Sequence, residues 1–590
     1  MTITPPQAGD VTAAAARSCP DAPGAPDVPG APDPGGRTTF VSQGFLARAA
    51  FVTVVLSLAG AVLGLGRDQA LAHLFGAGRE TDAFLVAWTV PEFAATLLIE
   101  DGLAFALVPA FSAVVARRAR GDTGDPVRAL VRGTLPRLVP AFAVASALLI
   151  WGAPYLVEML APGLPDPRLA VDCTRLTGTC VLTFGLAGYC SAALRAHRRF
   201  VAPAAIYVAY NTAVITGMFV LGGRWGVRAA AIGVAVGGAL MIVTQLPSLL
   251  RLLHRRQAAL GADAMDTTNA MDPAAPPAAP ADPGNLADPG DPADPADPAA
   301  DRRAMNLVLF VTVLLFALCR QSQVLIERFL ASTLPAGAIS HLNFAQKVAQ
   351  MPMVLALMLC TVTFPVVSQA LAEGDIERAR DRVERDLRAV SWVVLLGTAA
   401  VVACAPQLIH LLFQRGAFTA QDTAATAAVM RVYALGLLGQ ALVGALVRSY
   451  FSAGRPTWYP VVAMTAGIVA TSWIGTATVD SWGVLGIAAA NAAGITLTAL
   501  ILLYGMGSHS VPIRTWQVLA GMSRPLRAAV VACGLGGFGA ALVDSPALGL
   551  TAGGTAVALV FLLLAGMPGG QGLTPALRTV TRRLPHARFR

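Results

Sequence analysis

The sequence has little charge and almost no lysine. Asp, Glu, Lys and Arg make up 13% of the 590 residues, whereas 55% are hydrophobic and the mean hydropathy is +0.62. Soluble proteins carry about 25% charged residues, so a string of soluble domains is excluded and a polytopic membrane protein is predicted. The net charge of +9 does not indicate nucleic-acid binding, because the arginines lie in short gaps between apolar runs, as in cytoplasmic membrane loops.

Motifs for metal binding and covalent catalysis are missing as well. The eight cysteines show no C-x-x-C spacing and most lie in apolar runs, which is typical of core thiols. The aspartates of residues 257–303 resemble the magnesium motifs of prenyl-transfer enzymes, but the prolines between them prevent the helix that would put the carboxylates on one face. We therefore expect no catalytic residue, no cofactor and no resident metal.

Long apolar stretches dominate the rest of the chain. Fourteen are long enough to cross a hydrocarbon core of about 30 Å as helices. They lie near 45–66, 82–113, 137–160, 174–194, 201–222, 226–251, 304–330, 337–371, 388–411, 424–448, 456–476, 484–506, 522–543 and 547–567. The predicted fold is an all-α polytopic membrane protein with about 14 transmembrane helices.

Composition and an internal duplication predict the domain order. We expect a disordered cytoplasmic tail at 1–40, a six-helix lobe at 41–256, a disordered Ala/Asp/Pro linker at 257–303, a second six-helix lobe at 304–506, two additional helices in 507–570 and a basic tail at 571–590. The lobes are expected to be pseudo-repeats, because residues 153–160 parallel residues 405–412. Repeated lobes with broken helices are typical of transporters whose site lies between the lobes. Chance similarity of segments rich in small residues is the alternative.

Three of the apolar stretches carry polar residues on one helical face. The sets are Glu92, Thr96 and Glu100; Arg320, Gln323 and Glu327; and Asn343, Gln346, Lys347 and Gln350. Polar side chains in hydrocarbon cost on the order of 2.5–3.5 kcal/mol each, so we expect these sets to line a wet, charged cavity.

Lys347 is the single lysine among 43 basic residues. Its place deep in an apolar stretch favours contact with an anion. The alternative is a structural ion pair with Glu327 or Glu100. For Arg320 with Glu327, a structural pair is as good an interpretation as a functional one.

Several motifs resemble those of one known family. The matches are Gly60–Asp68 to S-R-x-x-G-x-x-R-D, Phe75–Gly78 to F-G-A-G, Thr81–Phe84 to T-D-A-F, Pro91–Asp101 to P-N-x-x-R-R-x-x-x-E-G, Ala106–Pro109 to A-F-V-P, and Phe413–Thr419 to F-x-x-G-x-F-T. These motifs are similar to those of the MurJ (MviN-type) lipid II flippases, within the multidrug/oligosaccharidyl-lipid/polysaccharide exporter superfamily. The chain resembles a divergent member, because Ala61, Ala95 and Thr96 stand where the family has arginines that are taken to contact the substrate diphosphate. Arg67 remains, and Lys347 corresponds to a family arginine.

This resemblance implies a flippase that moves a polyprenyl-diphosphate-linked saccharide from the inner to the outer leaflet of the bacterial cytoplasmic membrane by alternating access. Together with the polar sets, it implies a cavity lined by Arg67, Asp68, Asp82, Glu92, Glu100, Arg320, Glu327, Asn343, Lys347 and Gln350. For Arg67 with Asp68, an interfacial ion pair is the alternative. The expected partners are the lipid-linked saccharide diphosphate and membrane lipids, with a coupling ion and cell-wall synthesis proteins as further candidates. No nucleic acid is expected.

Two other functions stay open at this point. A cation-coupled exporter, like the multidrug and toxic compound extrusion proteins, is favoured by the acidic residues Glu92, Glu100 and Asp101. A transport-inactive scaffold that recruits envelope-synthesis proteins is favoured by the missing arginines.

The arginine bias predicts that both termini and residues 117–132 and 257–303 face the cytoplasm, and that residues 411–423 face the outside. Cysteines placed singly at Asp125, Pro280 and Ala420 test this with a membrane-impermeant thiol reagent on intact cells. We expect labelling above that of the parent chain at position 420 alone. Labelling at 125 or 280 but not at 420 would contradict the orientation.

Overall fold

The computed structural model describes residues 43–100, 102–119, 126–197, 199–269, 298–452 and 457–566. Contacts divide the chain into two units, Met1–Arg48 and Ala49–Arg590, and the packing described below lies within the second. The predicted tails at 1–40 and 571–590 and the middle of the predicted linker lie outside the described residues.

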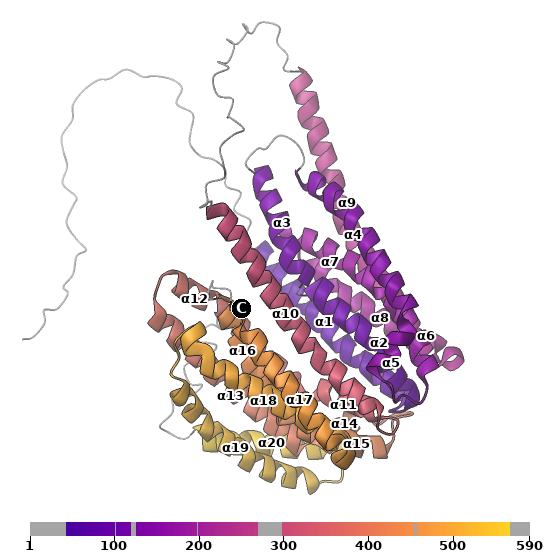
Figure 1. The fold of residues 1–590 in the computed structure, drawn as a ribbon, viewed down its shortest axis with the longest axis vertical. Coiled ribbons are helices and arrows are strands. Elements are labelled where there is room, and N and C mark those ends of the chain that lie inside the picture. Colours follow the sequence, from indigo (N-terminus) through magenta and orange to yellow (C-terminus); the bar gives the residue numbers. More distant parts are fainter. Residues whose placement is uncertain are drawn as a thin grey trace, which may run out of the picture. The chain divides into compact units, whose positions relative to one another are not determined.

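Every regular element of the described ranges is a helix (Figure 1). The order is α1 (Gln43–Phe75), α2 (Arg79–Ala94), the π-helical η1 (Ala95–Glu100), α3 (Gly102–Ala119), α4 (Pro126–Trp151), α5 (Ala153–Leu160), α6 (Pro167–Gly178), α7 (Cys180–Ala196), α8 (Val201–Trp225), α9 (Arg228–Asn269), α10 (Pro298–Ser332), α11 (Ala338–Ala349), α12 (Met351–Ala372), α13 (Ile376–Ala403), α14 (Ala405–Phe413), α15 (Ala420–Ala434), α16 (Leu437–Ser452), α17 (Tyr459–Trp482), α18 (Val484–His509), α19 (Thr515–Ala541) and α20 (Pro546–Gly566).

The helices confirm an all-α polytopic membrane fold. Within the described residues, eleven segments are long and apolar enough to cross a membrane, and the pair α15 and α16, bent by 47°, would make twelve. The count of about 14 therefore stays a prediction. The predicted linker differs at both ends, because α9 continues to Asn269 and α10 begins at Pro298. Residues 252–269, which extend α9 beyond the apolar stretch, are rich in Ala and Leu. They contain no proline, and the next one is Pro273, so the helix can continue.

Two helix breaks repeat along the chain at the duplicated residues. A long helix, α4, ends at Trp151, and the short α5 begins at Ala153. In the same way α13 ends at Ala403 and the short α14 begins at Ala405. Each short helix has a proline in its first turn, where the missing N–H leaves no hydrogen bond unmade. The repeated Ala-Pro therefore marks the same local structure twice.

The packing is closest within two groups of helices, which we call the N-half (α1–α9) and the C-half (α10–α18). α8 packs along α9 in the N-half, and α17 packs along α18 in the C-half. α19 and α20 pack on each other and on α13. Between the halves, α2 contacts α10 and α11, and α3 and α5 contact α10, the helix of the C-half that borders the N-half in Figure 1.

The hydrophobic cores show where the halves join. One core contains side chains of both, including Phe84 of α2 and Leu342 of α11. A second contains only N-half residues, around Phe111 and Tyr189, and a third contains residues of the C-half and α19, around Tyr450. The halves thus share a core in one region and have separate cores elsewhere.

The joined region includes three turns, at residues 76–78, 333–337 and 414–419, which we call the turn cluster. The backbone N–H of Ala417 donates to the carbonyl of His73, over 2.8 Å. Gly76 has a φ of +67°, and a Cβ there would lie 2.6 Å from the carbonyl oxygen of Ala417. A side chain at this position would meet both backbone strain and a clash. The F-G-A-G motif and the motif at Phe413–Thr419 therefore meet here.

Asp82 of the T-D-A-F motif joins α2 to the start of α11. Its carboxylate accepts hydrogen bonds from the N–H of Gly337 (2.6 Å), the N–H of Ser340 (2.8 Å) and the hydroxyl of Ser340 (2.5 Å). The first N–H groups of a helix lack partners within it, and the positive end of the helix dipole favours an anion. Asp82 thus caps α11 from another segment of the chain.

We expect Asp82→Ala to lower the free energy of unfolding by about 1.5–3 kcal/mol, because the lost bonds are to a charged acceptor. Thermal unfolding of the purified protein measures this. A cysteine at the buried Ala338 should also react faster with a thiol reagent when α11 loses its cap.

The matched control is Asp375→Ala, which removes the side-chain cap of α13, an exposed bond of 2.9 Å to the N–H of Arg378 within the same half. It should cost less and leave labelling at 338 unchanged. Equal labelling rates in the Asp82 variant and the parent would show that the cap does not hold the halves together.

Candidate functional site

α2 and η1 present polar groups to the C-half at successive levels away from the turn cluster. Arg328 of α10 donates to the hydroxyl of Thr89, and its Nη2 lies 3.1 Å from Oε2 of Glu92. Farther along, Gln321 donates through Nε2 to the hydroxyl of Thr96, over 2.9 Å. The line of contact between α2, α10 and α11 is therefore polar, inside helices that are otherwise apolar.

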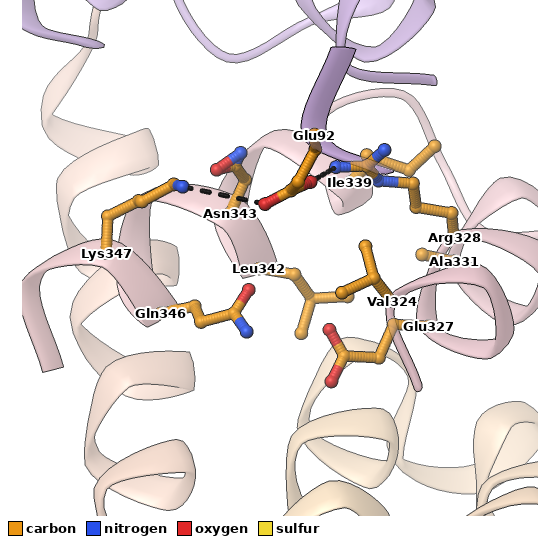
Figure 2. Close-up of a pocket in the computed structure, with 10 residues that line it drawn as sticks. All are labelled: Glu92, Val324, Glu327, Arg328, Ala331, Ile339, Leu342, Asn343, Gln346 and Lys347. Carbon is orange, nitrogen blue, oxygen red and sulfur yellow. Dashed lines mark hydrogen bonds and ion pairs between the residues drawn. The ribbon is translucent and has the colours of Figure 1, made fainter. Parts of the chain in front are cut away.

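Glu92 is the centre of this contact. Its Oε1 lies 3.8 Å from Nζ of Lys347, so one carboxylate of the N-half bridges two cations of the C-half. Figure 2 shows the carboxylate between Arg328 on one side and Lys347 on the other. The Arg328 side chain is 7% exposed, against 27% for Glu92 and 35% for Lys347, so the arginine bond is the better shielded of the two.

The bridged charges border a small cavity. Its lining residues are Glu92, Val324, Glu327, Arg328, Ala331, Ile339, Leu342, Asn343, Gln346 and Lys347 (Figure 2). Its volume is about 20 Å³, room for roughly one water molecule. Sites for small molecules usually measure about 300–1,000 Å³, so the halves are closed around the charges in this structure.

Two bonded networks hold the C-half side of the cavity. Glu327 accepts a hydrogen bond from the amide of Asn491 on α18, and both are buried. On α11, Gln346 donates to the hydroxyl of Tyr433 over 2.8 Å, and Gln440 of α16 donates to the same oxygen over 3.0 Å. The backbone of α11 that carries Lys347 is therefore tied to its own half.

The structure brings five of the residues of the predicted polar sets together at the cavity, namely Glu92, Glu327, Asn343, Gln346 and Lys347. The alternative interpretation of Lys347, a structural ion pair with Glu327 or Glu100, named other partners than the structure has, since the lysine pairs with Glu92. The physical reason is that α11 packs beside α2 near Glu92, whereas Glu327, on the same cavity, accepts a hydrogen bond from Asn491 of α18.

The other predicted residues lie elsewhere. Arg67 is bonded to Asp68 (2.7 Å) and to Asn211 (3.3 Å), with its guanidinium 4.2 Å from the ring centre of Trp88, all within the N-half. Asp82 lies beside the turn cluster, where it accepts from the N–H of Gly337. Glu100 is exposed and accepts from the hydroxyl of Tyr207, over 2.8 Å.

Two more predicted residues of the C-half lie away from the cavity. Arg320 is exposed on α10, whereas Glu327 is buried and bonded to Asn491, and no ion pair joins these two described residues. Gln350 donates to Gln440 over 3.3 Å within the C-half. A direct role of these distant residues in binding stays a prediction.

Arg328 lines the cavity but belongs to none of the polar sets predicted from the sequence. The set on this stretch consists of Arg320, Gln323 and Glu327, and Arg328 follows it directly. Its signal was an arginine within an apolar stretch, which by itself indicates a functional residue. Within the described residues no group of three or more His, Cys, Asp or Glu side chains is placed to hold a metal ion.

The comparisons with known proteins agree on one family. A family model described as lipid II flippase MurJ matches residues 71–548. The lipid II flippase MurJ of Burkholderia cenocepacia is 26% identical over 480 residues, which cover 79% of this chain and 84% of the relative. The probable lipid II flippase MurJ of Vibrio cholerae is 23% identical over 482 residues, with 79% and 84% covered.

Solved structures show the same fold. A lipid II flippase MurJ in an inward closed conformation is similar with a TM-score of 0.67 at 18% identity, over 90% of this chain and 100% of that one. A multidrug resistance MATE family transporter in an inward-facing conformation gives 0.56 at 13% identity, over 80% and 98%. The family model covers most of the chain, including the helices of both halves, and the chain therefore belongs to the lipid II flippase MurJ family.

Proposed function

We propose that the protein moves a polyprenyl-diphosphate-linked saccharide, of the lipid II type, from the inner to the outer leaflet of the bacterial cytoplasmic membrane. Transport proceeds by alternating access of the two halves, with both termini in the cytoplasm and no covalent step. Family membership supports the cargo class, because the curated relatives are named lipid II flippases. The polyprenyl tail stays in lipid while the charged head crosses.

The observation that carries the proposal is the pair of cations, Arg328 and Lys347, at the contact between the halves. The guanidinium of an arginine binds phosphate oxygens in a two-pronged geometry, and a lysine contributes a compact charge. In a site shielded from water these attractions are much stronger than in solution. A diphosphate is the group of the proposed cargo that such a pair would hold.

The arrangement of the halves supports alternating access. They share a core and the turn cluster in one region, and the arginine bias predicts that this region faces outside. The cavity of about 20 Å³ cannot hold a diphosphate in the present state. Cargo binding therefore requires α2 to move away from α10 and α11, which the separate cores of the two halves permit.

The rival functions find less support in the site. Glu92, the main acid in favour of a cation exporter, is already held by two cations. The scaffold hypothesis rests on the absence of arginines at Ala61, Ala95 and Thr96. Arg328 supplies a cation at the contact from α10, so the lack of arginines at these positions of α1 and η1 does not leave the site without one.

A growth test in a bacterium depleted of its own lipid II flippase examines the proposed function directly. We expect the full chain to sustain growth, because cargo of this class must then be moved by the new protein. The control is the Lys347→Ala variant at an equal level in the membrane, which should not sustain growth. Failure of the inserted wild-type chain, both here and in vesicles loaded with lipid II, would refute the proposal.

Lys347 gives a second prediction. Lys347→Ala should lower flipping of a lipid-linked saccharide by at least about tenfold without unfolding the protein, because a diphosphate left short of a cation in a shielded cavity loses well over 1.4 kcal/mol. Lys347→Arg should keep much of the activity, since charge and phosphate binding are retained.

Flipping rates in reconstituted vesicles measure both variants, and Arg228→Ala, which breaks only an exposed pair with Asp172 at 2.8 Å, is the matched control. If the protein exported cations instead, Lys347→Ala would leave export intact or raise it. Full flipping by the alanine variant would show that the lysine does not hold the diphosphate.

A further inference from the structure

We infer that Glu92 is a tethered counter-anion for the cargo. Its carboxylate occupies Arg328 and Lys347 while the protein is empty, and the diphosphate displaces it on binding. This inference rests on the proposed function and adds a residue that controls affinity and release.

The geometry of the carboxylate is the first support. The two oxygens of Glu92 face different cations on different helices, at 3.1 Å from Arg328 Nη2 and 3.8 Å from Lys347 Nζ. Glu384 also contacts two arginines, Arg388 and Arg514, but both cations of Glu92 border the cavity at the contact between the halves. Here one anion bridges two cations, in the way that the oxygens of a phosphate group would.

The closed cavity is the second support. Beside the bridged charges there is room for about one water molecule, so an incoming anion finds the cations covered. It can reach them only after the carboxylate leaves. The contact with Lys347 is the longer and the more exposed of the two, so displacement begins there.

The helices that carry the cations keep other bonds without Glu92. In the closed state Arg328 still donates to Thr89 of α2, and α11, which carries Lys347, stays bound within the C-half through Gln346 and Tyr433. A binding site whose backbone is already placed needs less reorganisation when its ligand arrives. Loss of the carboxylate therefore uncovers the two cations without removing the helices that present them.

Exchange between carboxylate and diphosphate has a consequence for the transport cycle. Two cations left without an anion in a shielded place would be costly, and Glu92 avoids this state after cargo release. Its competition also weakens cargo binding, because apparent affinity falls with the fraction of protein in which the cations are free. Glu92 thus lowers the affinity for cargo, speeds cargo release and stabilises the empty protein on its return.

The test compares purified wild-type protein with Glu92→Gln in lipid nanodiscs. The probe is a polyprenyl diphosphate, and the polyprenyl alcohol of the same chain length reports binding of the tail alone. We expect Glu92→Gln to bind the diphosphate about tenfold more tightly, equivalent to about 1.4 kcal/mol, with no change for the alcohol. In flipping assays it should show both a lower KM and a lower turnover, since release slows.

Two further variants keep the test sharp. Glu92→Asn introduces the residue that the family pattern P-N-x-x-R-R has at this position. It should also tighten diphosphate binding, and it serves as the test variant if Glu92→Gln folds poorly. Asp172→Asn removes a carboxylate that is also paired with an arginine, Arg228, but far from the cavity in an exposed pair, and should leave affinity unchanged.

The outcomes separate the two proposals. If wild-type protein binds the diphosphate and both folded Glu92 variants bind it equally or more weakly, Glu92 is a structural partner of the cations and the counter-anion inference is wrong. If wild-type protein and the variants all fail to bind the diphosphate above the level of the alcohol, the proposed function fails and this inference with it.

Discussion

The carboxylate of Asp82 on the first turn of α11 is the contact on which the site depends. It fixes the register of two helices that start together in the turn cluster and run side by side. Glu92 follows Asp82 by ten residues, and Lys347 follows Gly337 by ten, so both lie about 15 Å along their helices. The pair of Glu92 and Lys347 is therefore a geometric result of the cap at Asp82.

The charges along α2 are stabilised by being shared between the halves. An isolated ion in this setting would be strongly unfavourable, whereas bridged and hydrogen-bonded ions are tolerated. At Thr96, a departure from the family pattern adds a hydrogen bond between the halves. Where the resemblance expects an arginine, a threonine hydroxyl accepts from Gln321 of α10, so the position joins the halves and contributes no cation. The cations come from α10 and α11 instead.

The same contacts set what must change during transport. Most helix packing lies within the halves, so each can move with little internal rearrangement. Between them lie the shared apolar core and, beside it, the cap at Asp82, the bridge at Glu92 and the bond at Thr96. These polar contacts can be exchanged for other polar partners. An apolar interface of the same extent would lack such substitutes.

Apolar stretches could be predicted from the sequence because helix formation in a membrane is a local requirement: every backbone group must be bonded within its own segment. The breaks at Gly152 and Cys404 fall inside the predicted stretches 137–160 and 388–411, where the repeated Ala-Pro indicated only a duplication. The T-D-A-F motif was identified through the family resemblance. The polar sets on three stretches led to Glu92, Glu327, Asn343 and Lys347, since polar groups in hydrocarbon need a purpose. Their pairing was decided only by tertiary structure. One residue turns a helix by about 100°, so whether Glu327 or Arg328 faces α2 depends on how α10 is rotated against a distant segment, and that rotation is set by packing between the halves.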